Sequence, residues 1–429
     1  MIALKPTPYL NFSCPVCSQN HLPVTKTFFA GIRTIAYTTC PNCQTPLAQD
    51  YPIGHALHYQ MAINTSTHTL YNSSAKWWSE PFLKGFLDPK NEEIKIEKKV
   101  FRATKKIVLL NTIDYLYGHS LLKLLNAQDH IQNSGIDLVI IAQKNFEWLI
   151  PQGCAEVWLV DLPFSKAKNW YTALDSFVQT ELLRFEEVHL SLAFSHPRGV
   201  NIEHFTKVKP FDLQCYADEP PQITFVWRND RLWHSNVWQE KLYLVVGYFK
   251  ALHWLKKYFV WLQKRKFANT FTQIKKLMPT AQINVVGIQK SGGFAPFVND
   301  QRVEKPNDAT EQAWCKIYAK SHVVIGVHGS NMILPTALAA GFIEILPEER
   351  YGNITQDVLL RHEGNTALYL GRFADGHISP KQLALMARRM VKYFPHFYLN
   401  NAHEFVLHKS YEDVSKWKKM RSEYFAKNI

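Results

Sequence analysis

Short apolar runs recur along the chain, and most are followed by a polar loop and a helix-like stretch. Runs of this length that are bounded by turn residues indicate β-strands buried on both faces. Strands that alternate with helices predict parallel sheets that helices cover on either side. The sequence therefore predicts an α/β protein with strands at 107–110, 136–142, 156–161, 186–194, 223–228, 281–288, 323–327 and 342–347.

This order of elements restarts after Pro220 and Pro221, which predicts two α/β domains rather than one. A chain of 429 residues is also too long for a single ordinary domain. Helical character extends over 237–278, in one or two helices, and returns near the carboxyl terminus. We therefore expect a small module at 1–60, α/β domains at 61–218 and 219–385, and a helical tail at 386–429.

Four of the seven cysteines form two C-x-x-C pairs, Cys14 with Cys17 and Cys40 with Cys43. Each pair can place two thiolates on one tight turn, and two such turns complete a tetrahedral zinc site. The 22 residues between the pairs include a stretch with the composition of a β-hairpin. We predict a structural Zn²⁺ in an N-terminal zinc ribbon; four unrelated thiols in a reducing compartment are the alternative.

The net charge of +13 favours an anionic partner, such as nucleic acid, an acidic membrane surface or a phosphate-bearing ligand. Lysine and arginine are scattered outside 254–276 and 416–421, and this pattern disfavours nucleic acid. The first residues lack the layout of a secretory signal, and no segment has ~18 uninterrupted apolar residues. We therefore expect a cytoplasmic protein without a transmembrane helix.

Two segments combine basic with apolar or aromatic residues, in a way that suits peripheral contact with an anionic membrane. One is 242–266, and the other is the tail that contains Lys416, Lys418, Lys419 and Arg421. Such contact would place the protein at the inner face of a membrane. The alternative for 242–266 is a buried helix with a solvated basic end.

Three polar segments follow predicted strands, at 117–120, 228–231 and 328–331. Ligands in open α/β sheets bind at the carboxyl ends of the strands, and small residues beside a helix start suit a phosphate group. Arg228 or Arg231 can add a bidentate contact to the same anion. For Ser330 and Asn331, a helix N-cap is the alternative. The chain lacks the glycine-rich fingerprints of nicotinamide enzymes and P-loop ATPases, which disfavours both classes.

Three ordered stretches of the chain resemble the sequence blocks of the family 61 glycosyltransferases. They read YGHSLLKLL, ITFVWRNDRLW and TEQAWCKIYAKSHVVIGVHGSNMILPTALAAGFIEILP, and lie within 105–350. The resemblance implies a GT-B architecture, in which two Rossmann-like domains with parallel sheets face each other. It also implies a nucleotide-sugar donor, inversion at the anomeric carbon and no required catalytic metal. The zinc ribbon is outside the usual family pattern.

By position, the residues that match the family's blocks are His119, Arg228, Gln312, His328, Gly329 and Glu344. The chain departs from the family at Ser120, where an aromatic residue is usual, and at Lys123, where an acidic residue is frequent. It also has Ser330 and Asn331 where the family usually has Ala and Gly.

An inverting transferase needs a base for the acceptor and positive charge or dipoles for the departing diphosphate. We expect His119 to be the base, with Asp114 as the second candidate. We expect the diphosphate to be held by Arg228, Arg231 and the turn His328, Gly329, Ser330 and Asn331. Glu344 can accept a hydrogen bond from the ribose or pair with a lysine, and Asp230 is expected to orient Arg228.

The leading hypothesis is therefore a hexosyl- or pentosyltransferase that moves sugar from a nucleotide-diphosphate sugar to a glycan, a lipid-linked acceptor or a protein. The alternative is a module in which the zinc ribbon binds nucleic acid or protein and the α/β domains are an inactive remnant. A third hypothesis is an enzyme of similar fold that modifies a sugar or nucleotide, such as an epimerase.

Overall fold

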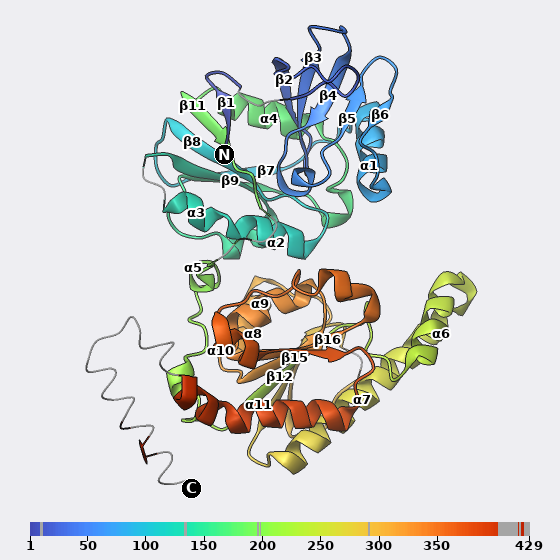
Figure 1. Cartoon of the computed structure of the whole chain (residues 1–429), viewed down its shortest axis with the longest axis vertical. Helices are drawn as coiled ribbons and strands as arrows, with labels where there is room; N and C mark the ends of the chain where they lie inside the picture. Colours follow the sequence, from blue (N-terminus) through green and yellow to red (C-terminus); the bar gives the residue numbers. More distant parts are fainter. Residues whose placement is uncertain are drawn as a thin grey trace. The chain divides into compact units, whose positions relative to one another are not determined.

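The computed structural model describes residues 1–8, 12–132, 135–194, 197, 199–290, 292–401, 419 and 422–423. The chain forms two compact units, Met1–Phe205 and Thr206–Ile429, and each is described by itself (Figure 1). The predicted boundary between 218 and 219 therefore lies inside the second unit. The predicted module at 1–60 is part of the first unit.

The first unit contains a six-stranded sheet in the order β1-β11-β8-β9-β10-β7. Its four central strands are parallel, as predicted, because apolar side chains fill both of their faces. The two edge strands are antiparallel and were not predicted. The strand bounds are β1 (Ile2–Lys5), β7 (Ile96–Val100), β8 (Lys106–Asn111), β9 (Asp137–Gln143), β10 (Glu156–Val160) and β11 (Glu187–Leu190).

Helices cover both faces of this sheet (Figure 1). One face packs against α4, because Leu174 and Val178 share a hydrophobic core with Ile107 and Leu109 of β8. The helix α2 follows β8 directly, and its four leucines are fully or almost fully buried. The helices of this unit are α1 (Lys76–Leu87), α2 (Tyr117–Leu125), α3 (Ala127–Ile131), α4 (Thr172–Leu182) and α5 (Ile202–Thr206), with short 3₁₀ turns η1 (Gly54–Leu57), η2 (Lys144–Leu149) and η3 (Phe164–Lys166).

A second, five-stranded antiparallel sheet follows the first cysteine pair. The predicted hairpin is present as its first two strands, in which Phe28 lies opposite Ile35. Side chains near the cysteines, such as Phe12 and Leu47, belong to the same core as Ile107, so the two sheets pack as one body. The strands are β2 (Val24–Phe29), β3 (Thr34–Thr39), β4 (Pro46–Asp50), β5 (Ala62–Asn64) and β6 (Leu70–Tyr71).

The second unit contains a six-stranded sheet in which all strands are parallel. The order β14-β13-β12-β15-β16-β17 corresponds to 3-2-1-4-5-6 along the chain. This is the strand order of classical dinucleotide-binding sheets. The strands are β12 (Gln222–Trp227), β13 (Gln282–Ile288), β14 (Val298–Val303), β15 (Val323–Val327), β16 (Gly341–Leu346) and β17 (Gly371–Asp375).

On one face of this sheet, α7 and α11 lie together, and α8 and α9 lie on the other (Figure 1). The predicted boundary of a tail at 385/386 falls inside α11, whose Leu383 and Ala387 are buried in the core of the sheet. The basic part of the tail lies almost entirely outside the described residues. The helices are α6 (Val237–Tyr248), α7 (Lys256–Leu277), α8 (Asp308–Tyr318), α9 (Ile333–Leu338), α10 (Gly364–Leu370) and α11 (Pro380–Asn401), with 3₁₀ turns η4 (Leu213–Cys215), η5 (Lys250–Leu255), η6 (Ser330–Met332) and η7 (Glu348–Asn353).

One or two helices were predicted over 237–278, and the structure has two, α6 and α7. The interpretation of 242–266 as a buried helix is wrong, because many of its large apolar side chains are exposed. None of the described helices is both long and apolar enough to span a bilayer.

Candidate functional site

The four cysteines of the C-x-x-C pairs meet in the first unit. Their sulfur atoms all lie within 4.8 Å of one another. The Sγ atoms of Cys14 and Cys43 are 3.6 Å apart, and those of Cys17 and Cys40 are 3.5 Å apart. Tetrahedral Zn²⁺ with bonds of ~2.3 Å separates its thiolates by about 3.8 Å. The cluster can therefore hold a metal ion such as zinc.

The two cysteine turns have the same local geometry. In each turn the backbone N–H four residues after the first cysteine bonds to that cysteine's carbonyl: Ser18 to Cys14 and Gln44 to Cys40, both at 2.9 Å. Ser18 and Gln44 both have a φ near the left-handed region, at 60° and 57°. Thiol ligation would fill all four coordination positions, which is typical of a structural site.

In the second unit, β12 and β15 are neighbours at the point where the strand order reverses. Parallel sheets of this order bind ligands beyond the carboxyl ends of these two strands. The predicted segments 228–231 and 328–331 follow β12 and β15 directly, and the structure brings them together. We refer to these two loops and the residues they contact as the switch-point site.

Arg228 joins the two loops of the switch-point site. Its Nη1 donates to the carbonyl of His328 at 3.1 Å and to Oδ1 of Asn331 at 2.8 Å. Its Nε and Nη2 donate to the carboxylate of Asp230 at 2.8 and 2.6 Å, so the predicted pairing is present. Because these bonds engage its guanidinium group, Arg228 holds the two loops together, and it has no pair of N–H groups left for a bidentate contact with a ligand.

Gly329 makes this contact between the loops possible. Its φ is +155°, and a Cβ at this position would lie 1.8 Å from Nη1 of Arg228. Any side chain would therefore displace the guanidinium. The predicted alternative, in which Ser330 or Asn331 caps the N-terminus of a helix, is wrong. Neither η6 nor α9 has a side-chain N-cap hydrogen bond.

Beneath the turn, His328 and Glu344 are both completely buried. His328 Nδ1 lies 2.6 Å from Glu344 Oε2, and its Nε2 lies 3.3 Å from Asp357 Oδ2. Burial raises the pKa of Glu344 to about 7, although the hydrogen bond to His328 opposes that rise. The pair fixes the turn from the interior of the sheet, so neither side chain is presented at the surface.

Positive charge accumulates at the switch-point site. Arg231 donates to the carbonyl of His328, and it has no carboxylate partner at ion-pair distance among the described residues. Burial lowers the pKa of Arg231, and so do the nearby charges of Arg228 and Arg350. Asp230 and Asp357 partly oppose this lowering, and Arg228 is already paired with Asp230. Arg231 and Arg350 are therefore the cations of the site that suit an anion.

Several buried polar atoms at this site have no hydrogen-bond partner in the part of the chain that the structure describes. Most buried polar groups in proteins are satisfied, so a local group of exceptions needs an explanation such as a ligand. Donors and acceptors are both present, which suits a ligand that offers both. These atoms are Asn229 Oδ1, Asn331 Nδ2 and Arg350 Nε, together with His328 Nε2 and Glu344 Oε1 of the buried pair beneath the turn.

A second polar cluster follows β8 in the first unit, where β8 and β11 meet at the corresponding reversal of strand order. The two candidate bases, Asp114 and His119, lie together here, with His119 Nδ1 3.4 Å from the carboxylate. His55 completes the cluster, with its Nε2 3.1 Å from His119 Nδ1 and 3.2 Å from Asp114 Oδ2. We refer to these residues, together with Lys123, as the Asp114 cluster.

Lys123 balances the charge of Asp114. Its ammonium is 2.9 Å from Oδ2 of Asp114 and donates to the carbonyl of Ile113 at 3.0 Å. Burial alone would raise the pKa of Asp114, but the charge of Lys123 and hydrogen bonds from His119 and His55 hold it well below its usual value. Burial lowers the pKa of His55. The carboxylate of Asp114 is therefore held ionised within reach of two imidazole rings.

The donor set of His55, Asp114 and His119 is also compact enough for a metal ion. The ammonium of Lys123 already neutralises the one carboxylate of that set, however, so proton transfer suits the cluster better than cation binding. Sequence reasoning missed His55, because a lone histidine in a short 3₁₀ turn has no motif around it.

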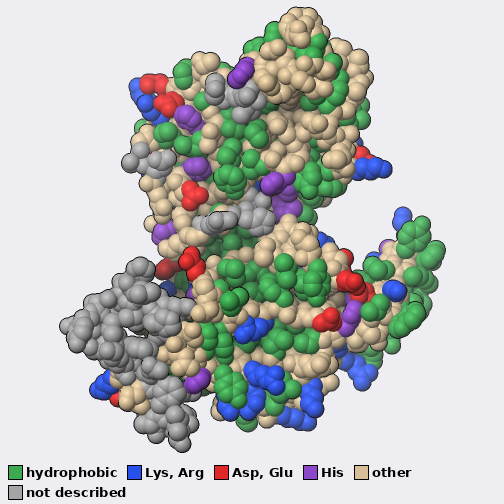
Figure 2. Space-filling view, viewed as in Figure 1, with side chains coloured by type: hydrophobic (Ala, Val, Ile, Leu, Met, Phe, Trp, Pro, Cys, Tyr) green, Lys and Arg blue, Asp and Glu red, His purple; other side chains and the backbone are tan. Residues whose placement is uncertain are grey.

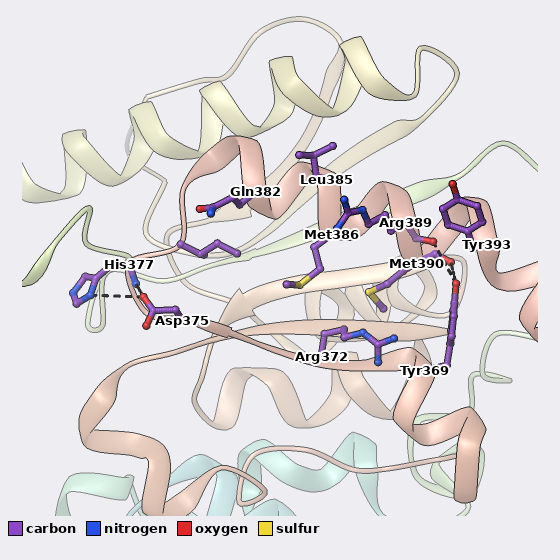
Figure 3. Close-up of a pocket in the computed structure, with 11 residues that line it drawn as sticks. Tyr369, Arg372, Asp375, His377, Gln382, Leu385, Met386, Arg389, Met390 and Tyr393 are labelled. Atoms are coloured by element: carbon purple, nitrogen blue, oxygen red, sulfur yellow. Dashed lines mark hydrogen bonds and ion pairs between the residues drawn. The ribbon is translucent and has the colours of Figure 1, made fainter.

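A pocket of the second unit lies elsewhere, between the edge strand β17 and α11 (Figure 3). Its lining mixes apolar side chains such as Met386 with Arg372 and Arg389. Arg372 donates to backbone carbonyls of Leu368 and Gly371, so its charge is partly engaged. Among the described residues that line this pocket, none has an unpartnered buried polar atom of the kind found at the switch-point site.

Two predicted residues lie away from these contacts or contribute little to them. Gln312 is exposed on α8, and the side chain of Ser330 is half-buried at the start of η6. The other predicted site residues gather in the three groups described above. Neither a protein-family model nor a curated protein matches the chain.

Proposed function

We propose that the chain is a glycosyltransferase that uses a nucleotide-diphosphate sugar as donor and binds it at the switch-point site. The observation that carries this proposal is the group of unpartnered buried polar atoms beside three arginines, at the strand reversal of a 3-2-1-4-5-6 sheet. Sheets of this order bind nucleotides at that place. A GT-B arrangement of the two units and inversion at the anomeric carbon are part of the proposal.

In this proposal, Arg231 and Arg350 stabilise the negative charge of the departing diphosphate. Preorganised cations and N–H groups lower the barrier when charge develops on a leaving group. Arg228 acts indirectly, because its contacts to Asp230, His328 and Asn331 hold the loops in place. The amides of Asn229 and Asn331 are the candidates for contacts with the ribose or base.

The Asp114 cluster supplies the base that activates the acceptor hydroxyl. His119 is a better candidate than Asp114, because the carboxylate is fully buried and held ionised by Lys123. A carboxylate with so low a pKa is a weak base but a good partner for an imidazolium. The four thiols hold a structural Zn²⁺ in a zinc ribbon that fastens the first unit, and the transfer itself requires no metal. The acceptor is a glycan, a lipid-linked sugar or a protein.

The deciding experiment is thermal unfolding of the full chain with UDP, GDP, CMP or ADP. A ligand that binds only the native state stabilises it by about 2.7 kcal/mol at 100 times its Kd. We expect one diphosphate to raise the transition temperature, and we expect Arg231→Gln to remove that shift. Arg388→Gln, on α11, is the matched control and retains it. If no nucleotide shifts the transition, and RNA or DNA does, the nucleic-acid-binding alternative replaces this proposal.

A further inference from the structure

The segment α6, η5 and the first half of α7 carries a concentration of exposed apolar side chains. Ten of the 27 large hydrophobic residues that are exposed in the described chain fall between 237 and 261. Isolated exposed apolar residues are ordinary, but a contiguous patch of this kind marks an interaction site. Figure 2 shows these hydrophobic side chains gathered over α6, with lysine and arginine among them. The ten are Val237, Trp238, Leu242, Leu244, Val245, Tyr248, Phe249, Trp254, Tyr258 and Trp261.

This patch follows from how the two helices attach to the unit. Val246 is the one fully buried residue of α6, and it packs with Phe259 of α7 in a small separate cluster. In α7, Phe259 is buried, whereas Tyr258 and Trp261 are exposed. Trp254, at the end of η5, is also exposed and precedes Tyr258 by four residues. The aromatic rings of Tyr258 and Trp261 stack at 5.7 Å. The helices therefore hold a preformed aromatic face outward.

The charges around this face have one sign. Between 237 and 265 there are six lysines and arginines and one acidic residue, Glu240. Glu240 is already paired with His377, at 2.8 Å. Lys241 and Arg265 lie over the rings of Trp238 and Trp261, so the cations flank the aromatic face directly. The face is thus apolar at its centre and cationic at its margin.

We propose that α6, η5 and the first half of α7 form a docking surface for an anionic lipid bilayer. Tryptophan and tyrosine prefer the membrane–water interface, and flanking lysines are attracted by acidic headgroups. A second copy of the chain fits this face less well, because it would bring two cationic margins together. The attachment is peripheral, since no described helix can span a membrane. This inference does not depend on the proposed donor site.

The test is co-sedimentation of the full chain with vesicles of phosphatidylcholine alone or of equal parts phosphatidylcholine and phosphatidylglycerol. We expect binding to the anionic vesicles, weakened by salt, and little binding to the neutral ones. The variant Trp238→Ser/Tyr248→Ser/Trp254→Ser should bind the anionic vesicles at least about tenfold more weakly. Replacing Lys241, Lys250 and Lys257 by Gln should weaken binding about fivefold for each charge.

The matched control replaces three equally exposed apolar residues elsewhere, as Phe101→Ser/Leu183→Ser/Leu368→Ser. This variant should bind vesicles as the unmodified chain does, and thermal unfolding should confirm that every variant is folded. Failure of the unmodified chain to sediment with anionic vesicles would overturn the proposal. It would also be overturned if light scattering found a dimer that the tryptophan and tyrosine substitutions dissociate, because the face would then serve self-association.

Discussion

The two units place a charged cluster at the same point of the same strand order. Four neighbouring strands of the first unit, β10-β9-β8-β11, have the order 3-2-1-4 when they are numbered along the chain. The strands β14-β13-β12-β15 of the second unit have the same order. Asp114 follows the first strand of one, and Arg228 follows the first strand of the other. The Asp114 cluster contains its own counter-charge in Lys123. The switch-point site has an excess of arginine and several unpartnered polar atoms.

This difference indicates which of the two clusters is better suited to bind a ligand. A buried charge that is paired and hydrogen-bonded is stable by itself, whereas an unpartnered buried polar atom costs about 1–3 kcal/mol. Oδ2 of Asp114 also lacks a hydrogen-bond partner, but the ammonium of Lys123 lies 2.9 Å from it and balances its charge within the cluster. The switch-point site has several unpartnered atoms, and it is therefore better suited to binding a ligand. Each unit therefore contributes a different property to the same proposed reaction.

The largest expected effect separates the two units by their metal dependence. Cys40→Ser should remove the bound metal and unfold or strongly destabilise the first unit, because structural zinc contributes about 10 kcal/mol or more in small domains and this cluster shares the unit's core. Metal analysis and thermal unfolding measure both effects. Cys215→Ser, at an exposed cysteine of the second unit, is the control and should change neither. Purified protein that contains no metal would contradict the prediction.

The next effect concerns the charge balance of the Asp114 cluster. Asp114→Ala should lower the free energy of unfolding by about 3–5 kcal/mol, because it leaves the ammonium of Lys123 buried without its partner. Chemical denaturation measures the loss. Asp137→Ala removes a partner from the partly exposed pair with Arg102 and should cost less than about 1 kcal/mol. Equal losses in the two variants would contradict the assigned role of burial.

A pH dependence is expected from the buried carboxyl beneath the switch-point site. The pKa of Glu344 is raised from 4.5 to about 7, so the native state retains a proton that the unfolded state loses. The resulting stability is complete below pH 4.5 and is lost as the pH rises through 7, by up to about 3 kcal/mol. The free energy of unfolding, measured by chemical denaturation at each pH across this range, should depend less on pH in Glu344→Gln. Glu348→Gln, at an exposed glutamate, should retain the slope.

The smallest expected effect on stability tests how the loops of the switch-point site are joined. Gly329→Ala places a methyl group against the guanidinium of Arg228 and should cost about 1–3 kcal/mol while weakening nucleotide binding. Gly352→Ala is the control, because a Cβ there meets nothing within 4 Å. Thermal unfolding with and without nucleotide measures both effects. Unchanged nucleotide binding in Gly329→Ala would separate the turn from the donor site.

Much of the strand pattern could be predicted, because buried parallel strands have a strong local signal. The apolar run at 323–327 matches β15 (Val323–Val327), and the composition between the cysteine pairs predicted the hairpin. The edge strands β7 and β14 were not predicted, since IEKKV and VNDQRV are mostly polar. Edge strands are partly solvated, so hydrophobicity does not identify them.

The site was predicted in part for a similar reason. Residues beside a buried strand, such as Arg228 and His328, stand out because polar groups interrupt an apolar pattern. His55 lies in η1, far from Asp114 in sequence, and only tertiary contact reveals that it belongs to the cluster. Glu344 stood out as a carboxylate within a strand, but its bond to His328 depends on the pairing of β15 with β16.

The sequence by itself determined the alternation of strands and helices, the two cysteine turns and the polar loops that follow the strands. These features are encoded by local composition, spacing and turn chemistry. Tertiary structure decided which loops meet, which charges are balanced and whether an apolar helix is covered. The exposed face of α6 and α7 illustrates this, because its sequence resembles that of a buried helix. Burial depends on what packs against a surface, and distant parts of the chain supply that packing.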